Sequence, residues 1–239
     1  MTVSFGIRFR FSRDATLKYI AHLDMLRLFE RTLRRSGLPV AHSQGFNPRM
    51  KLVFGLPMAM GLTSGSEYAD VELEREVAPD LFLQTMNRSL PQGMKILAAV
   101  PVATNENIML RIGAARYWVL FRSERQISAD EMQDLLQRLI DAESVPVMKK
   151  GKKGLHEVNV RPLVFSAAVA KVDGEWLLEA FLSAGANDNL RPDLFMEAWQ
   201  HLVSRTFQIR AMHREELYAS MDNEWVEPTD PRACGVPVS

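Results

Sequence analysis

The first residues of the chain carry apolar side chains at every second position, and the spacing then changes. Apolar residues alternate with glycine or arginine over positions 5–11, which predicts a half-buried strand. Further along, Leu26, Phe29 and Leu33 share one face of a predicted helix, and Gly37 is the residue type that commonly ends one. The chain therefore begins with a strand followed by a helix.

The rest of the first half extends this order, and a short repeat links it to the second half. The pattern predicts strands at 40–43, 50–56 and 67–74, a helix from Pro79, and a strand at 94–100. We interpret the order as strand, helix, strand, strand, helix, strand. The tetrapeptide PDLF at 79–82 recurs at 192–195, at the same place in the pattern of the second half.

The second half repeats the order of elements. It is predicted to contain a strand at 117–122, a helix capped by Ser128, strands at 157–171 and 175–183 joined by a tight turn, a helix around Phe195, and a strand at 207–212. Two tandem ferredoxin-like units with antiparallel sheets follow from this order, so the predicted fold class is α+β. We expect the units at residues 1–103 and 114–218, and a flexible acidic tail at 219–239.

Composition narrows the class of protein. The chain of 239 residues has 29 basic and 29 acidic side chains, so its net charge is zero, which argues against coating nucleic acid through bulk electrostatics. Cys234 is the single cysteine, which leaves no disulfide and no cysteine-ligated cluster within one chain and fits a reducing cytoplasm. We find no signal peptide and no apolar run of the roughly 20 residues that a membrane helix needs.

The predicted first helix carries a stripe of arginines opposite its apolar face. Arg27, Arg31, Arg34 and Arg35 follow one another at helical spacing, and residues 5–51 hold ten basic side chains against three acidic ones. This segregated charge favours a phosphate-binding face. The alternative is a solvated helix face held by local ion pairs.

Aromatic residues and a lysine run extend this candidate surface. Phe9, Phe11 and Phe46 could stack bases near the arginines, although alternating phenylalanines also suit a core. The run at 149–154 holds four lysines and two glycines, which predicts a mobile loop that either contacts phosphates or serves solubility. The candidate nucleic-acid or partner-binding residues are His22, Asp24, Arg27, Arg31, Arg34, Arg35, Gln44, Phe46, Asn47, Arg49, Lys51, Lys149, Lys150, Lys152 and Lys153.

Two histidines are the candidates for catalysis. His22 and His42 could serve as acid and base of a metal-independent endoribonuclease, or His22 could belong to the apolar face at the start of the helix. The usual hydrolase, metalloprotease and dinucleotide-binding motifs do not occur, and we expect no metal site in this chain. Catalysis therefore has little support in the sequence.

Five segments resemble one known family. They are YIAHLDMLR at 19–27, RRSGLP at 34–39, AHSQGFNP at 41–48, KLVFGLP at 51–57 and REELY at 214–218. With them the chain resembles a radical SAM-associated domain family of unknown function, in its free-standing form. In that family Asn-Pro is commonly followed by His-Pro, whereas this chain has Arg49 and Met50, so the position keeps a cation but has no imidazole.

The resemblance implies a partner more firmly than a reaction. Members of the family are joined to, or encoded beside, radical SAM proteins, often of the cobalamin-binding kind. An iron-sulfur cluster, S-adenosylmethionine and cobalamin are therefore expected on the partner, and no cofactor on this chain. We expect a cytoplasmic accessory protein that binds or presents an RNA or ribonucleoprotein substrate to a radical SAM enzyme. The alternatives are an endoribonuclease-like RNA-processing enzyme and a pure protein–protein scaffold.

Overall fold

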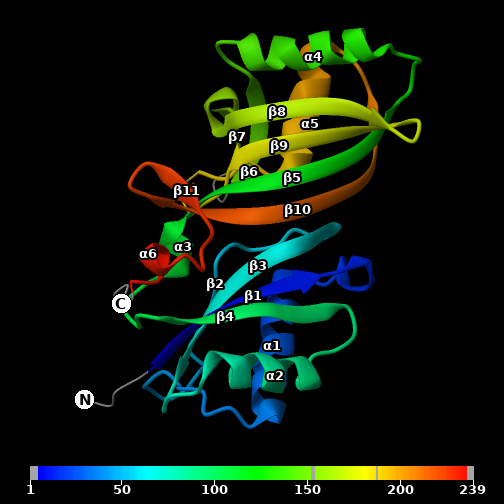
Figure 1. Ribbon diagram of the computed structural model, residues 1–239. Coiled ribbons are helices and arrows are strands. Elements are labelled where there is room, and N and C mark those ends of the chain that lie inside the picture. Colours follow the sequence, from blue (N-terminus) through cyan, green and yellow to red (C-terminus); the bar gives the residue numbers. More distant parts are fainter. Residues whose placement is uncertain (1–4, 152–153, 187, 236–239) are drawn as a thin grey trace. The chain divides into compact units, whose positions relative to one another are not determined.

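The structure, a computed structural model, describes residues 5–151, 154–186 and 188–235 (Figure 1). The chain is an α+β protein whose sheets are mostly antiparallel, which confirms the predicted class. It forms two compact units. One comprises Met1–Gly113 together with Glu216–Ser239, and the other comprises Ala114–Glu215.

The first unit is a sheet with two helices against one face. Its main elements are β1 (Phe5–Arg13), α1 (His22–Ser36), β2 (Leu52–Phe54), β3 (Leu62–Leu73), α2 (Pro79–Ser89) and β4 (Met94–Val102). A short 3₁₀ turn, η1 (Ala15–Leu17), links β1 to α1. The strand order is β4–β1–β3, with β2 paired to the far side of β3. Figure 1 shows α1 and α2 next to each other on one face of this sheet.

Phenylalanines on β1 place the core between the sheet and the helices. Phe9 and Phe11 are buried, and the ring of Phe9 lies 5.7 Å from that of Phe29 on α1 and 5.5 Å from that of Phe82 on α2. Burying one such side chain fully stabilises the fold by about 1.5–3 kcal/mol. The helix ends as expected at Gly37, whose φ of 70° is left-handed. These contacts fix α1, and so fix the direction in which its polar face points.

The polar face of β1 is covered by the end of the chain. Arg8 is fully buried and donates two hydrogen bonds to the carboxylate of Asp70, at 2.7 and 2.8 Å. It donates two more, each of 2.9 Å, to the carbonyl oxygens of Pro228 and Ala233. The short elements in this part of the first unit are α3 (Ile108–Arg111), β11 (Glu224–Val226) and α6 (Pro231–Cys234). Figure 1 shows α3 and α6 close together, and Ala103 N donates to Cys234 O at 3.0 Å.

The prediction of a flexible acidic tail at 219–239 is therefore wrong for the described residues of this segment, which end at 235. Acidic and proline-rich composition is typical of loose ends. Here β11 pairs with the last residues of β10, and Ala233 and Cys234 are buried. Its backbone carbonyls satisfy a buried guanidinium, and that long-range requirement leaves no local pattern in the sequence.

The second unit has the same arrangement with an added hairpin. Its elements are β5 (Ile112–Ser123), α4 (Ala129–Asp141), β6 (Pro146–Gly151), β7 (Gly154–Asn159), η2 (Arg161–Leu163), β8 (Val164–Val172), β9 (Glu175–Ser183), α5 (Pro192–Val203) and β10 (Phe207–Met221). The sheet order is β10–β5–β9–β8, and β6 pairs with β7 in a separate two-stranded sheet. Trp199 Nε1 of α5 donates to the carbonyl oxygen of Leu135 on α4, at 3.0 Å.

Three expected strands differ from the observed ones. The strand expected at 157–171 is divided, because β7 ends at Asn159 and Pro162 lies within η2 before β8 begins. The strand expected at 207–212 continues to Met221, so residues from Glu216 onward belong to the first unit. In place of a strand at 40–43 there are isolated bridges, Val40 with Leu73 and His42 with Met50.

Among the described residues, every helix is too short or too polar to cross a lipid bilayer.

Candidate functional site

A cationic groove lies between α1 and the segment that follows it. We call it the α1 groove, and it has a volume of about 420 Å³. Its lining residues are Leu23, Leu26, Arg27, Glu30, Arg34, His42, Pro48, Arg49 and Met50. Four of the side chains singled out in the sequence as candidates, three arginines and one histidine, therefore line the same groove.

Local structure explains why these side chains meet. Met25, Phe29 and Leu33 are buried, so Arg27 and Arg34 project from the opposite side of α1. The segment 41–51 folds back on itself. Lys51 N donates to Ala41 O at 2.9 Å, Ser43 N donates to Arg49 O at 2.8 Å, and Arg49 N donates to Ser43 Oγ at 3.0 Å. These bonds close a loop, which we call the 44–49 loop, and hold Arg49 beside the helix.

The charges of the α1 groove are largely uncompensated. Among the described residues, Arg34 and Arg49 form no ion pair, and Glu30 is the acidic residue in the lining. Arg27 pairs with Asp24 at 3.0 Å, but both side chains are more than half exposed. Exposed pairs of this kind contribute about 0–1 kcal/mol, so an incoming anion can take over the arginine at little cost.

A second groove lies on the other side of α1. This neighbouring groove, of about 650 Å³, is lined by Tyr19, Ile20, Ala21, Asp24, Arg27, Leu28, Arg31, Arg35, Met60 and Pro91. Arg27 lines both grooves. Arg35 donates to the carbonyl oxygen of Ser89 at the end of α2, at 2.7 Å, so part of its hydrogen-bonding capacity is used within the unit.

Two aromatic side chains of the first unit are highly exposed, and each belongs to a segment that contributes residues to one of the grooves. Phe46 is fully exposed in the 44–49 loop, and Tyr19 is 72% exposed with Lys18 Nζ 5.1 Å from its ring centroid. The prediction that Phe9 and Phe11 stack bases is wrong, because both side chains are buried in the core. Phe46, which the sequence singled out, belongs to the same loop as Arg49. Tyr19, which it did not, lines the neighbouring groove together with Arg27, Arg31 and Arg35.

The remaining first-unit candidates lie outside the α1 groove. His22 packs edge-on against Phe54 with 5.7 Å between ring centroids, so the structure does not place it with His42 in the groove lining. Gln44 and Asn47 are exposed in the 44–49 loop. Lys51 pairs with Glu72 at 2.6 Å.

The lysine run lies in the second unit and is not a plain loop. Lys149 and Lys150 belong to β6, opposite His156 and Leu155 of β7, so the prediction of a mobile loop is wrong for these two residues. Lys149 Nζ donates to Asn189 O at 3.3 Å. Lys152 and Lys153 are outside the described residues.

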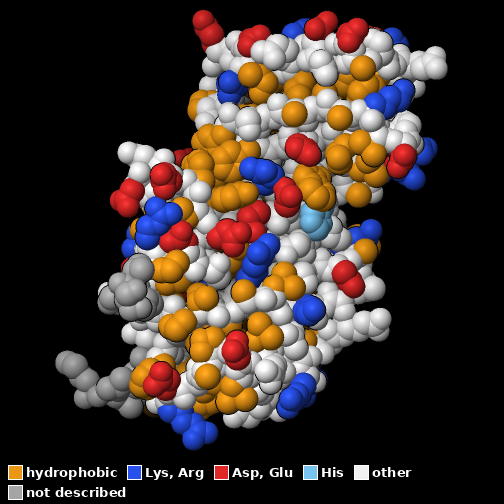
Figure 2. All heavy atoms as spheres, in the orientation of Figure 1, with side chains coloured by type: hydrophobic (Ala, Val, Ile, Leu, Met, Phe, Trp, Pro, Cys, Tyr) orange, Lys and Arg blue, Asp and Glu red, His pale blue; other side chains and the backbone are white. Residues whose placement is uncertain are grey.

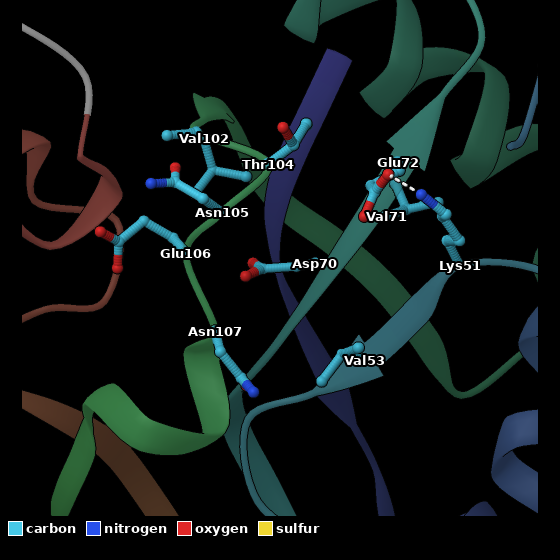
Figure 3. Close-up of a pocket in the computed structure, with 12 residues that line it drawn as sticks. Lys51, Val53, Asp70, Val71, Glu72, Val102, Thr104, Asn105, Glu106 and Asn107 are labelled. Atoms are coloured by element: carbon cyan, nitrogen blue, oxygen red, sulfur yellow. Dashed lines mark hydrogen bonds and ion pairs between the residues drawn. The ribbon is translucent and has the colours of Figure 1, made fainter. Parts of the chain in front are cut away.

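A smaller polar cavity of about 270 Å³ lies at the edge of the first sheet (Figure 3). Figure 3 shows Asp70 pointing toward its centre and the ion pair of Lys51 with Glu72 at its side. Burial raises the pKa of Asp70, and the ion pair with Arg8 opposes this shift. Because Arg8 already takes both carboxylate oxygens, Asp70 serves the structure of the sheet. The sequence analysis did not single out this residue.

The sequence analysis also did not identify the buried carboxylate of Glu216. Its Oε1 accepts hydrogen bonds from Ser66 Oγ at 2.5 Å and Tyr68 OH at 2.8 Å, and its Oε2 lies 2.8 Å from Arg10. Burial raises the pKa of Glu216, and it also raises that of Tyr68. One feature of the sequence hinted at a partner for Arg10. It alternates with buried phenylalanines in β1, so it lies on the other face of the strand, where a carboxylate can pair with it.

Charge is mixed on the face of the molecule drawn in Figure 2, where acidic and basic side chains are interspersed. Among the described residues, no group of three or more His, Cys, Asp or Glu side chains is placed to hold a metal ion. The lining of the α1 groove, by contrast with this mixed face, holds three arginines and one acidic residue.

The fold and the groove together define an α+β protein of two units with an arginine-lined groove on its first helix. The chain belongs to the DUF2344 family, described as an uncharacterized protein conserved in bacteria, whose model matches residues 6–192. The comparison with curated proteins gives no match.

Chains of two solved structures match this chain at low sequence identity. A chain in the crystal structure of a Cbf5–Nop10–Gar1 complex is 10% identical with a TM-score of 0.51, and the match covers 89% of this chain and 49% of that one. A chain of the archaeal box H/ACA sRNP Nop10–Cbf5 complex is 11% identical with a TM-score of 0.43, covering 86% and 46%. The chain therefore spans about half the length of these two chains.

Proposed function

We propose that this protein is a non-catalytic accessory module that binds RNA through the α1 groove and presents it to a partner enzyme. The observation that carries the proposal is the convergence of Arg27, Arg34 and Arg49 with His42 in one groove, where two of the arginines form no ion pair among the described residues. Guanidinium groups donate paired hydrogen bonds that match phosphate oxygens, and they stay charged at any physiological pH.

The arrangement of strands supports the same proposal. The order β4–β1–β3–β2 in the first unit and β10–β5–β9–β8 in the second is the order expected if each unit is ferredoxin-like. RNA-recognition modules use a four-stranded sheet with two helices of this kind, which is an analogy of fold alone. In this chain the arginines lie on the helical side, so the proposed contact uses α1 and the 44–49 loop instead of the sheet.

The proposed partner is a radical SAM enzyme, as the sequence resemblance implies. A radical SAM cluster needs three cysteine ligands, and this chain has one cysteine. The cluster, S-adenosylmethionine and any cobalamin would therefore be held by the partner. This chain would contribute binding and orientation of the substrate.

Binding is tested with a fluorescent single-stranded RNA of about 12 nucleotides, a length within the site sizes of single-strand binding folds. The double variant Arg34→Glu/Arg49→Glu is expected to bind at least about tenfold more weakly. If each arginine contacts one phosphate, the slope of log K against log salt falls by about 1.4, since each contact in a single strand contributes about 0.7. Arg138→Glu, an exposed position near the end of α4, is the matched control and should change neither quantity.

Unchanged affinity and salt slope in the double variant would remove the α1 groove from the proposal. The partner is tested separately, by affinity capture of the tagged chain from native extract divided into ribonuclease-treated and untreated halves. A radical SAM protein in both halves supports a direct partnership, and one in the untreated half alone indicates that RNA bridges the two. Capture of none in either half contradicts the proposed partnership.

A further inference from the structure

We infer that the α1 groove and the neighbouring groove form one track for a single-stranded segment of nucleic acid, which crosses α1 at Arg27 and stacks unpaired bases on Phe46 and Tyr19. The inference rests on the proposed function and makes it more specific, because it names the form of nucleic acid that the surface accepts.

Arg27 is the point where the two grooves meet. It lines both of them, and its side chain is 64% exposed. Arg34 and Arg49 continue the positive charge into the α1 groove, and Arg31 continues it into the neighbouring groove. The five arginines of the combined lining face two carboxylates, Asp24 and Glu30. A polyanion that crosses the helix therefore meets an excess of cations along its whole path.

The length of the arginine stripe fits a few nucleotides. From Arg27 to Arg34 the helix rises about 10 Å, at about 1.5 Å per residue. A stacked strand advances about 3.4 Å per nucleotide, so the part of the track between Arg27 and Arg34, within the α1 groove, spans roughly three of them. Nucleotides beyond Arg27 would continue across α1 into the neighbouring groove, toward Arg31 and Arg35.

The exposed aromatic rings offer surfaces on which bases can stack, and binding of phosphates alone would not require such surfaces. Phe46 and Tyr19 expose most of their surface to water, and each belongs to a segment that borders one of the two grooves. The lining of the α1 groove also includes the apolar side chains of Leu23, Leu26 and Met50. Exposed rings beside a cationic path are the combination that binds single strands, because every base has a face that can stack.

A duplex cannot use these rings in the same way. Its bases are paired and stacked on one another, and the major groove of an RNA duplex is too narrow for side chains to enter. A duplex would therefore contact the arginines through its phosphates and leave the rings in water. This difference separates the track from a simple phosphate-binding surface.

The experiment compares three ligands by fluorescence anisotropy with the full chain. They are a single-stranded RNA, a blunt duplex of the same length, and an abasic strand that keeps the phosphates but has no bases. We expect the single strand to bind at least about tenfold more tightly than either of the others. Phe46→Ala and Tyr19→Ala should each weaken binding of the single strand by about 5- to 100-fold, while the salt slope and the binding of the abasic strand stay unchanged.

Leu110→Ala is the matched control, because Leu110 is a large apolar residue of the same unit that is 75% exposed on α3 and lines neither groove. All three substitutions remove exposed side chains. Unchanged thermal unfolding therefore verifies that any loss of binding is local.

Two results would overturn the track but leave the proposed function standing. One is equal affinity for the single strand, the duplex and the abasic strand. The other is unchanged binding of the single strand by the Phe46 and Tyr19 variants. A polyglutamate peptide is tested as a competitor. If it displaces the labelled RNA as effectively as unlabelled RNA does, the surface binds acidic protein, and the inference of a nucleic-acid track is wrong. Absence of binding to all three nucleic acids overturns the track and the proposed RNA-binding function together.

Discussion

Replacing Arg8 tests how the end of the chain is held on the first sheet. Arg8→Met keeps an apolar stem of similar length but removes four hydrogen bonds, two to Asp70 and one each to the carbonyls of Pro228 and Ala233. Arg8 is fully buried, and the side chain of Asp70 is 14% exposed. Removing one partner of a buried ion pair costs about 3–5 kcal/mol, because the other charge stays in a poorly hydrated place. We expect the free energy of unfolding to fall by about 4 kcal/mol.

The loss should depend on pH with a definite sign. Burial already raises the pKa of Asp70 in the folded state, and without the opposing effect of Arg8 that pKa rises further. A carboxyl group whose folded pKa lies above its unfolded value stabilises the fold at low pH, and this contribution is lost as the pH rises through the folded pKa. The cost of Arg8→Met is therefore expected to be smaller near pH 5 than near pH 8.

Urea unfolding measures the total cost, and amide hydrogen exchange locates it. Exchange should accelerate most at residues 224–235, since their backbone loses its contacts with Arg8. The control is Arg75→Met, an exposed position after β3 that forms no ion pair among the described residues. A loss below about 1 kcal/mol, the size of an exposed pair, would refute the argument that burial gives this interaction its importance. Unchanged exchange at 224–235 would refute the link to the end of the chain.

Three further predictions follow from single contacts. Gly6→Ala should destabilise the fold by about 2 kcal/mol or more in urea unfolding, because the new methyl carbon would lie 2.3 Å from the carbonyl oxygen of Val102. Trp199→Phe removes the hydrogen bond from Nε1 to Leu135 O and should cost about 0.5–1.5 kcal/mol by the same measurement, since that carbonyl lies within α4 and still accepts its helical hydrogen bond. Burial raises the pKa of Glu216 above its ordinary value of 4.5, so its contribution to stability is greatest below pH 4.5 and is lost as the pH rises through the raised value. Glu216→Gln should therefore flatten the decline of stability with rising pH in this range, and an unchanged profile would contradict the assignment.

Local patterns in the sequence were sufficient for the parts of the fold that local forces determine. The alternating residues of β1 and the helical spacing of Leu26, Phe29 and Leu33 were interpreted correctly, because each pattern matches the period of one element. The arginine stripe was placed on the exposed side of α1 for the same reason.

What the sequence could not supply is the set of contacts between distant residues. The buried pair of Arg8 and Asp70 looks like ordinary surface charge until the end of the chain covers it. The closure of the 44–49 loop, which brings Arg49 beside Arg34, depends on a few backbone hydrogen bonds that carry no composition signal. The lysines of β6 likewise resembled a loop because glycines flank them, although strand pairing prevails.

The division of the chain between the two units has a consequence for its synthesis. The first unit is discontinuous, since residues 216–239 return to it after the whole of the second unit has been made. A ribosome that adds about 5–20 residues per second needs roughly 5 to 20 s to go from residue 113 to residue 216. During that interval Arg8 and Arg10, which were made much earlier, are still without the carbonyls and the carboxylate that later bind them. The second unit is thus free to fold first, and the first unit, with its candidate site, is completed last.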